Sequence, residues 1–333
     1  MVTVTMSDVA RAAGVSPMTV SNVINGRPNV GEQTRARVRE VIQDLGYQVN
    51  LTARHLRAGR SDSIALIVPN FNGYFGELAD SLDVMLQQTG RHLVMESTSA
   101  RVDAELEAFS AARLRTHDGA FISVSGLTAE QVAALQCPVP VVLLGERKMP
   151  NDLDHVQLDN VEGARLATNY LIQRGARRIA VLGGSLDSGW DMPFTRKEGW
   201  RLALGAAGLS AEQQLILPLE QFSSEEAMGV LAGLLRTETV DGVFAVTDTA
   251  ALGALAALHA AGLSVPGDVQ VCGFDNLESS RFVHPGGLST VGPARDELPR
   301  MALGLLDRRI AQTTAAPRQL TVPMRLYPRA TTR

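Results

Sequence analysis

Residues 5–26 read T-M-S-D-V-A-R-A-A-G-V-S-P-M-T-V-S-N-V-I-N-G, which indicates two short helices joined by a tight turn. Ser7 is predicted to cap the first helix, and Gly14 can adopt the positive φ that ends it. Ser16 is the predicted cap of the second helix, and Pro17 stands at its first position, where a missing N–H costs little. This arrangement is typical of the helix-turn-helix, whose second helix enters the DNA major groove.

The pattern D-V-A-x-x-A-G-V-S-x-x-T-V-S-x-V-I-N-G resembles the N-terminus of the lactose-repressor (LacI/GalR) family of transcription regulators. An ordinary helical hairpin inside a larger core is the alternative. The resemblance implies that Pro17, Met18 and Asn22 read bases. It further implies that polar residues contact the DNA backbone, namely Ser7, Ser16, Thr19, Ser21, Asn25 and Thr34. The family commonly has arginine where Asn22 stands, and asparagine prefers adenine whereas arginine prefers guanine, so we expect a different operator base there.

Charge is unevenly distributed along the chain. Residues 1–60 contain eight arginines, no lysine and four acidic residues, a net charge of +4, whereas the remaining residues carry −8. Phosphate binding needs a local basic surface and not a basic protein, so the overall charge of −4 is compatible with DNA binding. Arg35, Arg37 and Arg39 could each also belong to a merely solvated helix face.

Residues 30–45 have helical periodicity and predict a third helix that completes an all-α domain over 1–47. Over 48–60, the pattern N-x-x-A-x-x-L-x-x-G resembles the family's hinge helix. The resemblance implies that Leu56 wedges into the DNA minor groove and that Ala53 lets two hinge helices of a homodimer approach each other. A flexible linker is the alternative, because so short a helix is not stable alone.

Composition indicates a globular protein of two or three domains, with 333 residues, 45% hydrophobic and 20% charged. No apolar run reaches the length of a membrane span. The N-terminus lacks a basic region followed by an apolar stretch, so no secretory signal is predicted. Cys137 and Cys272 are the only cysteines, and two buried thiols in a reducing compartment are the simplest interpretation. We therefore expect a cytoplasmic protein without membrane contact.

From residue 61 onward, apolar runs alternate with amphipathic stretches, which favours parallel sheets. We expect strands at 64–68, 92–96, 120–124, 139–144, 179–182, 214–217, 243–246 and 269–273, and two short ones near Leu320 and Leu326. We expect helices at 75–89, 105–114, 129–135, 161–174, 196–207, 225–235, 250–261 and 298–310. The family resemblance implies a two-lobed, periplasmic-binding-protein-like α/β domain over 61–333, with crossings between the lobes near Asn160, Thr290 and Pro323. The N-lobe would comprise about 61–160 and 291–322, and the C-lobe about 161–290 and 323–333.

Ligands of parallel sheets bind beyond the carboxyl ends of the strands. That rule and family-like segments such as R-K-E-G-W and G-F-D-N predict the effector-binding residues Asn72, Tyr74, Phe75, Ser125, Arg147, Arg196, Phe222, Asp248 and Asp275. Arginine, carboxylates and aromatic rings suit a small polyhydroxylated ligand, most simply a carbohydrate. Four alternatives stay open: Phe75 and Phe222 as core residues, Asp248 as a helix cap, and Arg196 as part of a structural ion pair.

No catalytic, metal-binding or cofactor-binding motif emerges. The glycines at 183–184 lack the pattern of a nucleotide loop, and the six histidines lack metal-ligand spacing. We therefore predict a homodimeric transcriptional repressor of a near-palindromic double-stranded operator, controlled by a small-molecule effector. Whether the effector induces or co-represses stays open. A sugar-binding protein of a transport system is the alternative; an α/β enzyme has no support in the sequence.

Overall fold

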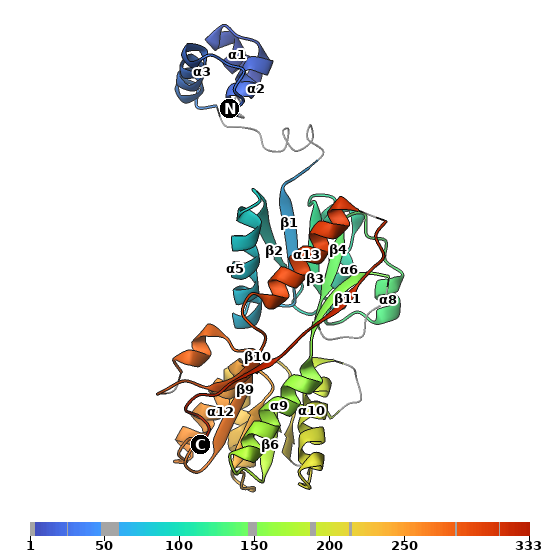
Figure 1. Ribbon diagram of the computed structural model, residues 1–333, viewed down its shortest axis with the longest axis vertical. Helices are drawn as coiled ribbons and strands as arrows, with labels where there is room; N and C mark the ends of the chain where they lie inside the picture. Colours follow the sequence, from blue (N-terminus) through green and yellow to red (C-terminus); the bar gives the residue numbers. More distant parts are fainter. Residues whose placement is uncertain are drawn as a thin grey trace. The chain divides into compact units, whose positions relative to one another are not determined.

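The computed structural model describes residues 4–24, 26–47, 60–145, 152–186, 191–212, 215–283, 285–312 and 314–333. The chain forms two compact units, Met1–Ser61 and Asp62–Arg333 (Figure 1). Each unit has its own hydrophobic core.

The first unit is a three-helix domain of α1 (Met6–Ala13), α2 (Pro17–Ile24) and α3 (Glu32–Asp44). The prediction that Ser7 caps α1 is wrong. Thr5 is the cap: its hydroxyl accepts from the Asp8 N–H, and the Asp8 carboxylate accepts from the Thr5 N–H at 3.0 Å. This reciprocal pair needs an acidic residue three positions after the cap, which Ser7 lacks.

Gly14 ends α1 at φ +64°, in the left-handed region where glycine is unstrained. The apolar residues that the helices bury form one small core, namely Val9, Ala10, Ala13, Val20, Val23, Val38 and Tyr47. The three helices therefore pack together through these side chains, and the turn at Gly14 lets α1 and α2 come together.

The N-lobe of the second unit contains a sheet with strand order β11-β5-β4-β3-β1-β2, in which every described pairing is parallel. Its strands are β1 (Ser63–Val68), β2 (His92–Ser97), β3 (Gly119–Ser123), β4 (Val141–Leu144), β5 (Asp154–Leu158) and β11 (Gln319–Val322). Its helices are α5 (Gly73–Gln87), α6 (Val102–Ala108), α7 (Ala111–Leu114), α8 (Ala129–Ala133) and α13 (Glu297–Ala311).

The C-lobe contains a sheet with strand order β12-β10-β9-β8-β6-β7, parallel except between β10 and β12. Its strands are β6 (Ile179–Leu182), β7 (Ile216–Leu217), β8 (Gly242–Ala245), β9 (Gln270–Phe274), β10 (Ser289–Gly292) and β12 (Arg325–Tyr327). Its helices are α9 (Asn160–Gln173), α10 (Met192–Ala206), α11 (Ser224–Leu234), α12 (Asp248–Ala260) and the 3-10 helix η2 (Glu278–Arg281).

The chain passes between the lobes three times, after Leu158, Gly292 and Val322. The second passage lies later than the expected position near Thr290, because β10 continues to Gly292 and pairs with β9. The predicted helix at 105–114 is in fact two helices, since the Ser110 hydroxyl starts α7 by accepting from the Arg113 N–H. Strands β5 and β10 were not expected.

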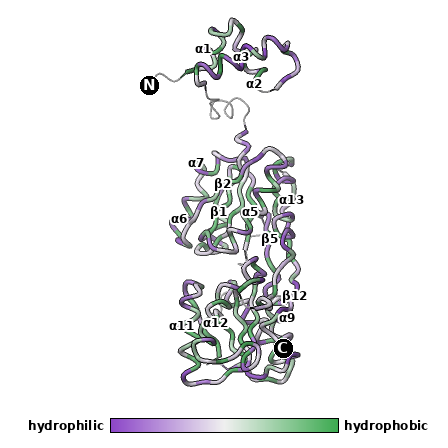
Figure 2. Tube along the Cα trace, turned by 90° about the vertical axis from the view of Figure 1, so that its left-hand side faces the viewer, coloured by the Kyte–Doolittle hydropathy of each residue, from purple (hydrophilic) through white to green (hydrophobic). Residues whose placement is uncertain are grey.

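The buried run in β1 shows why the sheets are covered on both faces. Ile64, Leu66 and Val68 pack with the cluster that includes α5 and α13, whereas Ala65 and Ile67 pack with the cluster of α6, α7 and α8. Because successive strand residues point to opposite faces, a run buried at every position requires helices on both sides. In Figure 2 the hydrophobic trace accordingly runs through the interior of both lobes.

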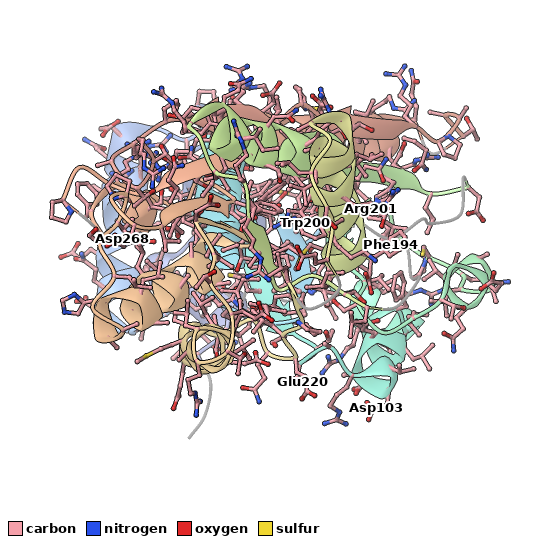
Figure 3. All side chains as sticks on the ribbon, turned by 90° about the horizontal axis from the view of Figure 1, so that it is seen from below. Asp103, Phe194, Trp200, Arg201, Glu220 and Asp268 are labelled. Atoms are coloured by element: carbon pink, nitrogen blue, oxygen red, sulfur yellow. The ribbon has the colours of Figure 1, made fainter. Side chains whose placement is uncertain are left out.

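Trp200 of α10 occupies the interior of the C-lobe, with no exposed surface, and donates its indole N–H to the Ile179 carbonyl at 3.1 Å. Figure 3 shows Trp200 among the elements of the lobe and Asp268 at the periphery. Cys137 is a partly buried free thiol, and Cys272 is a fully buried one. Within the described ranges, no helix is long and apolar enough to cross a membrane, and no group of three potential ligands could hold a metal ion.

Candidate functional site

Helix α2 presents a solvent-facing side opposite its buried one. Val20 and Val23 are buried, whereas Met18 is 70% exposed and Asn22 is partly exposed. Met18 and Asn22 are four residues apart, so they lie on the same helix face. Pro17 is exposed at the first position of the same helix. These three side chains are therefore accessible to a partner molecule that binds against α2.

The predicted DNA-backbone residues lie around this helix. The Ser16 hydroxyl accepts from the Thr19 N–H at 3.1 Å and lies 2.9 Å from the Thr19 hydroxyl. Ser7 is exposed near the start of α1, and Ser21 and Thr34 are partly buried. Asn25 lies outside the described residues. Ser16 therefore caps α2, as predicted from the sequence.

Arg35 has a structural role in this unit. Its guanidinium donates to the Arg27 carbonyl at 2.8 Å and so fastens the turn between α2 and α3. Arg37 and Arg39 are exposed on α3, as a phosphate-binding surface requires. The hinge residues Ala53 and Leu56 lie outside the described residues.

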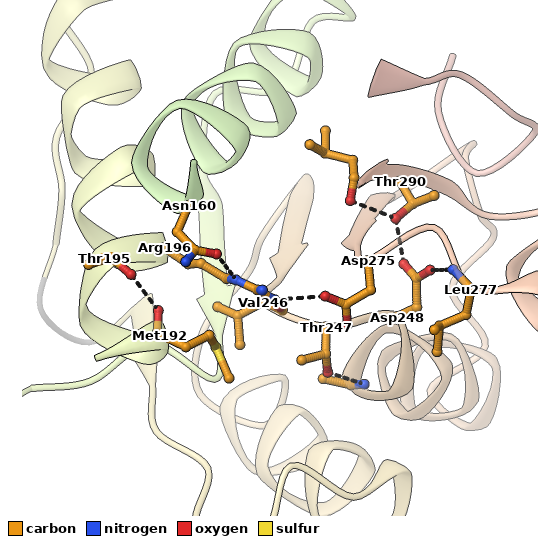
Figure 4. Close-up of polar contacts among 12 residues, drawn as sticks. Asn160, Met192, Thr195, Arg196, Val246, Thr247, Asp248, Asp275, Leu277 and Thr290 are labelled. Atoms are coloured by element: carbon orange, nitrogen blue, oxygen red, sulfur yellow. Dashed lines mark hydrogen bonds and ion pairs between the residues drawn. The ribbon is translucent and has the colours of Figure 1, made fainter. Parts of the chain in front are cut away.

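In the C-lobe, Arg196 joins three separate segments (Figure 4). Its Nε donates to Asn160 Oδ1 at 2.8 Å, and Nη1 donates to the Val246 carbonyl and to Asp275 Oδ1, the latter at 3.1 Å. The guanidinium carbon lies 3.6 Å from the centre of the Phe274 ring. Arg196 is 3% exposed, and its hydrogen bonds hold the ends of the neighbouring strands in place.

Asp275 follows β9 directly, with φ at +110°. Burial raises the pKa of Asp275 to about 6, and the adjacent Arg196 opposes that rise. A carboxyl group with such a pKa can accept hydrogen bonds from hydroxyl or amine groups when ionised and can donate one when protonated.

Asp248 is not the helix cap that was one alternative for it. Thr247 caps α12 by accepting from the Ala250 N–H at 3.0 Å. Asp248 instead accepts from the Thr290 hydroxyl at 2.5 Å and from the Leu277 N–H at 2.8 Å (Figure 4). Burial, and then neighbouring Asp275, raise the pKa of Asp248 well above its usual range. Asp248 therefore fastens the segment that follows Asp275.

A pocket lies between the lobes beside Asp275. Its lining comprises Tyr74, Glu77, Leu78, Ser81, Asp275, Asn276, Leu277, Pro293, Arg295, Leu298 and Pro299. Tyr74 and Asp275 were predicted from the sequence. Glu77 and Asn276 were not, although Glu77 lies about one helical turn beyond Tyr74 and Asn276 adjoins Asp275. The lining offers an aromatic ring, carboxylates and a guanidinium, which can bind a small polar molecule.

The other predicted effector residues that the structure describes do not line this pocket. Phe75 is partly buried and packs on the main core, 5.1 Å from Tyr74 between ring centres. Phe222 is also partly buried against that core. Asn72 is exposed before α5, and the Ser125 N–H donates to buried Glu105 at 2.8 Å. Arg147 lies outside the described residues. Phe75 and Phe222 therefore bury part of their surface in the core, as the alternative interpretation of these residues predicts.

Asn160 is a further polar residue of this site, although the sequence predicted it only as a position near a crossing between the lobes. It begins α9 after β5, is 5% exposed and accepts from Arg196. Because β5 was not predicted, the rule of strand ends could not select Asn160. A better assignment of that strand would have found it.

Residues 5–50 match the model described as "Bacterial regulatory proteins, lacI family", and residues 168–332 match "Periplasmic binding protein-like domain". The chain is 31% identical to catabolite control protein A of Priestia megaterium, over 99% of both chains. The chain belongs to the lacI family of bacterial regulatory proteins. The family is one of DNA-binding transcription regulators.

Two other relatives cover most of the chain. The repressor PurR of Actinobacillus pleuropneumoniae is 33% identical over 92% of this chain and 91% of its own length. The structure of the regulator CelR in complex with cellobiose has a TM-score of 0.71 and 28% identity, covering 98% of this chain and 99% of its own. This likeness over both units confirms the predicted lacI-family architecture of an N-terminal helix-turn-helix and a two-lobed α/β domain.

Proposed function

We propose that the chain is a homodimeric repressor that binds a near-palindromic operator, and that a small polyhydroxylated effector in the interlobe pocket changes its operator affinity. The observation that carries the proposal is the pocket lined by Tyr74 and Asp275, the latter oriented by Arg196. PurR is named a repressor, and CelR was solved with cellobiose, which supports this assignment. Acting on chromosomal DNA, the protein would reside in the cytoplasm.

Site roles are part of the proposal. Pro17, Met18 and Asn22 read bases, and Leu56 enters the minor groove beside Ala53. The residues that contact the DNA backbone are Ser7, Ser16, Thr19, Ser21, Asn25 and Thr34. The domains are 1–47 for DNA reading, 48–60 for the hinge and 61–333 for effector binding and dimerisation. Of the effector residues predicted from the sequence, Tyr74 and Asp275 would contact the effector in the pocket, and Arg196 would orient Asp275.

Selection from random duplex DNA with the full chain tests the operator half of the proposal. We expect enrichment of a near-palindromic site, because each protomer of a dimer presents one α2. Leu56→Ala should weaken binding to the selected site and leave binding to unrelated DNA unchanged, since only a specific complex would use the wedge. Equal losses on both DNAs would reject the wedge, and no enrichment would reject operator binding.

A thermal-shift screen tests the effector half. Mono- and disaccharides and nucleosides are added to the full chain, and a true effector should raise the melting temperature in wild type. The same compound should act weakly on Asp275→Asn and should change operator affinity. A sugar-binding transport protein is the alternative function, and it predicts a thermal shift without any selective DNA binding.

A further inference from the structure

Glu77 and Glu278 belong to different lobes and are joined by a hydrogen bond. Glu77 lies in the second turn of α5, and Glu278 is the first residue of η2. The Glu278 N–H donates to Oε1 of Glu77 at 2.7 Å. This N–H starts a helix and has no acceptor within η2, and the preceding residue, Leu277, provides no capping side chain. Glu77 therefore caps η2 from the opposite lobe.

An apolar contact accompanies this hydrogen bond. Leu277 is 5% exposed, and its Cδ1 would lie 3.1 Å from a Cβ built on Gly73, the first residue of α5. The stretch of α5 from Gly73 to Glu77 therefore faces the segment Leu277–Glu278. The two lobes meet here at a place other than their three connecting passages.

The C-lobe side of this contact is firmly attached to its own lobe. Asp248 accepts from the Leu277 N–H, and Arg329 Nη2 donates to Asn276 Oδ1 at 2.7 Å. Arg329 Nη1 also donates to the Ser280 hydroxyl at 2.8 Å within η2. The segment that carries Glu278 is thus fixed by contacts on both sides, so separating Glu278 from Glu77 requires the lobes to move.

We propose that the hydrogen bond between Glu77 and the Glu278 N–H is an interlobe latch that holds the ligand-free lobes together and is remodelled when an effector fills the adjoining pocket. This inference rests on the proposed function, because it describes the regulation of the same pocket. Glu77, Leu277 and Asp275 all line that pocket, so a bound molecule touches both sides of the latch. Burial is the main cause of the raised pKa of Asp275, and the charge of Glu77 adds to it, so Glu77 also acts electrostatically on the central effector residue.

Three variants separate the latch from other roles of these residues. Glu77→Ala removes the acceptor, whereas Glu77→Gln keeps an oxygen acceptor without the charge. Glu278→Ala is the matched control, because the latch uses only the backbone N–H of this residue. The Glu278 side chain lies 3.9 Å from Arg295, and both side chains are more than half exposed, so its loss should have little effect.

The first measurement is amide-resolved hydrogen exchange of Glu278 in the full chain without ligand, corrected for intrinsic rates. We expect exchange about 10-fold faster in Glu77→Ala and changes of less than about 3-fold in Glu77→Gln and Glu278→Ala, because only the first variant loses the acceptor. Far-UV circular dichroism checks that each variant is folded. Should Glu77→Ala not fold, Glu77→Lys provides the variant without an acceptor.

The second measurement is the distance between nitroxide labels at exposed Asp103 of the N-lobe and exposed Glu225 of the C-lobe, each replaced by cysteine in a Cys137→Ser background. Cys272 is fully buried and stays unlabelled. The latch requires a longer or broader distance distribution in Glu77→Ala and an unchanged one in Glu278→Ala. It is overturned if either measurement in Glu77→Ala matches wild type, or if Glu278→Ala behaves like Glu77→Ala.

Failure of the latch and failure of the proposed function give different results. Wild-type operator selection does not depend on Glu77, so it can succeed while both latch measurements fail. Conversely, exchange and label distance are measured without DNA or effector, so they can reveal the latch in a chain that selects no operator.

Discussion

Met18 and Asn22 are the side chains of α2 that face away from the buried Val20 and Val23. Met18 can make only apolar contacts, such as one with a thymine methyl group, whereas Asn22 can form two hydrogen bonds to an adenine edge. If α2 reads bases as proposed, discrimination between operators should depend mainly on Asn22.

Asn22→Arg should shift the preferred base at one position of each half-site from adenine to guanine. The guanidinium donates twice to O6 and N7 of guanine, and a good bidentate pair discriminates by about 1–3 kcal/mol. Parallel selections from random DNA with the two proteins measure the shift. Identical consensus sequences would show that residue 22 does not read a base.

Asp275 gives a second prediction at this scale. Its folded pKa of about 6 exceeds its usual 3.8, so the native state binds the proton more tightly than the unfolded state. The resulting stabilisation is full below about pH 4 and is lost as the pH rises to about 6. Relative to Asp275→Asn, the wild-type free energy of unfolding should therefore fall by roughly 1–3 kcal/mol between pH 4 and 6.

Urea unfolding followed by tryptophan fluorescence measures this difference at each pH. Asparagine keeps an oxygen that can accept from Arg196 and does not titrate, so it is the reference for the pH dependence. From pH 7 to 8 the difference between the two proteins should be constant, because the carboxyl group is then ionised in both the folded and the unfolded state. A difference that stays flat from pH 4 to 6, or that rises, would contradict the raised pKa.

The rule of strand ends selected Asp275, and the resemblance of R-K-E-G-W to a family segment added Arg196. The structure places these two residues in contact. Sequence patterns could not distinguish Thr247 from Asp248 as the cap of α12, because threonine and aspartate both cap helices and the two residues are adjacent. Nor could they anticipate Glu77, whose partner lies 201 residues away in the chain. Contacts between lobes depend on tertiary arrangement, which local patterns do not encode.

At the scale of elements, strands with continuous apolar runs were predicted well, as at β1, β3 and β8. Strand β5 was missed because its residues D-H-V-Q-L mix charged and apolar types, although Asp154 is fully buried between Arg308 and Arg309. The break between α6 and α7 was missed because the apolar periodicity continues across Ser110.

The packing of α9 against α10 depends on Gly199 in the R-K-E-G-W segment. A Cβ at Gly199 would lie 2.2 Å from the Val161 carbonyl oxygen and 2.6 Å from the Ala164 Cβ. Gly199→Ala should therefore force the helices apart and lower the free energy of unfolding by about 3 kcal/mol. Urea unfolding followed through Trp200, the next residue, reports this change.

Gly205 is the control on the same helix. A Cβ there meets nothing within 4 Å, so Gly205→Ala should stabilise the lobe slightly, by about 0.5 kcal/mol, through helix propensity. Two substitutions with equal effects would show that propensity, and not the contact between α9 and α10, governs position 199.

At the scale of the whole molecule, the two units have separate cores, so damage to one should spare the other. Val20 is fully buried in the small core of the first unit. Val20→Ala removes two methyl groups and should cost about 2 kcal/mol, a large fraction of the stability of so short a domain.

Operator binding measured against temperature should therefore fail at a lower temperature in Val20→Ala. Tryptophan fluorescence should melt as in wild type, because both tryptophans, Trp190 and Trp200, lie in the second unit. A lowered fluorescence midpoint would instead indicate that the two units unfold together.

The three passages between the lobes have a consequence for biosynthesis. The sheet of the N-lobe needs β11, and its β3–β5 surface needs α13, yet both are made after almost all of the C-lobe. A nascent chain that has not reached Glu297 therefore exposes part of the apolar N-lobe sheet to solvent. Ribosomal pausing before α13 would prolong that exposure and favour chaperone capture or aggregation, whereas pausing within the first unit would not.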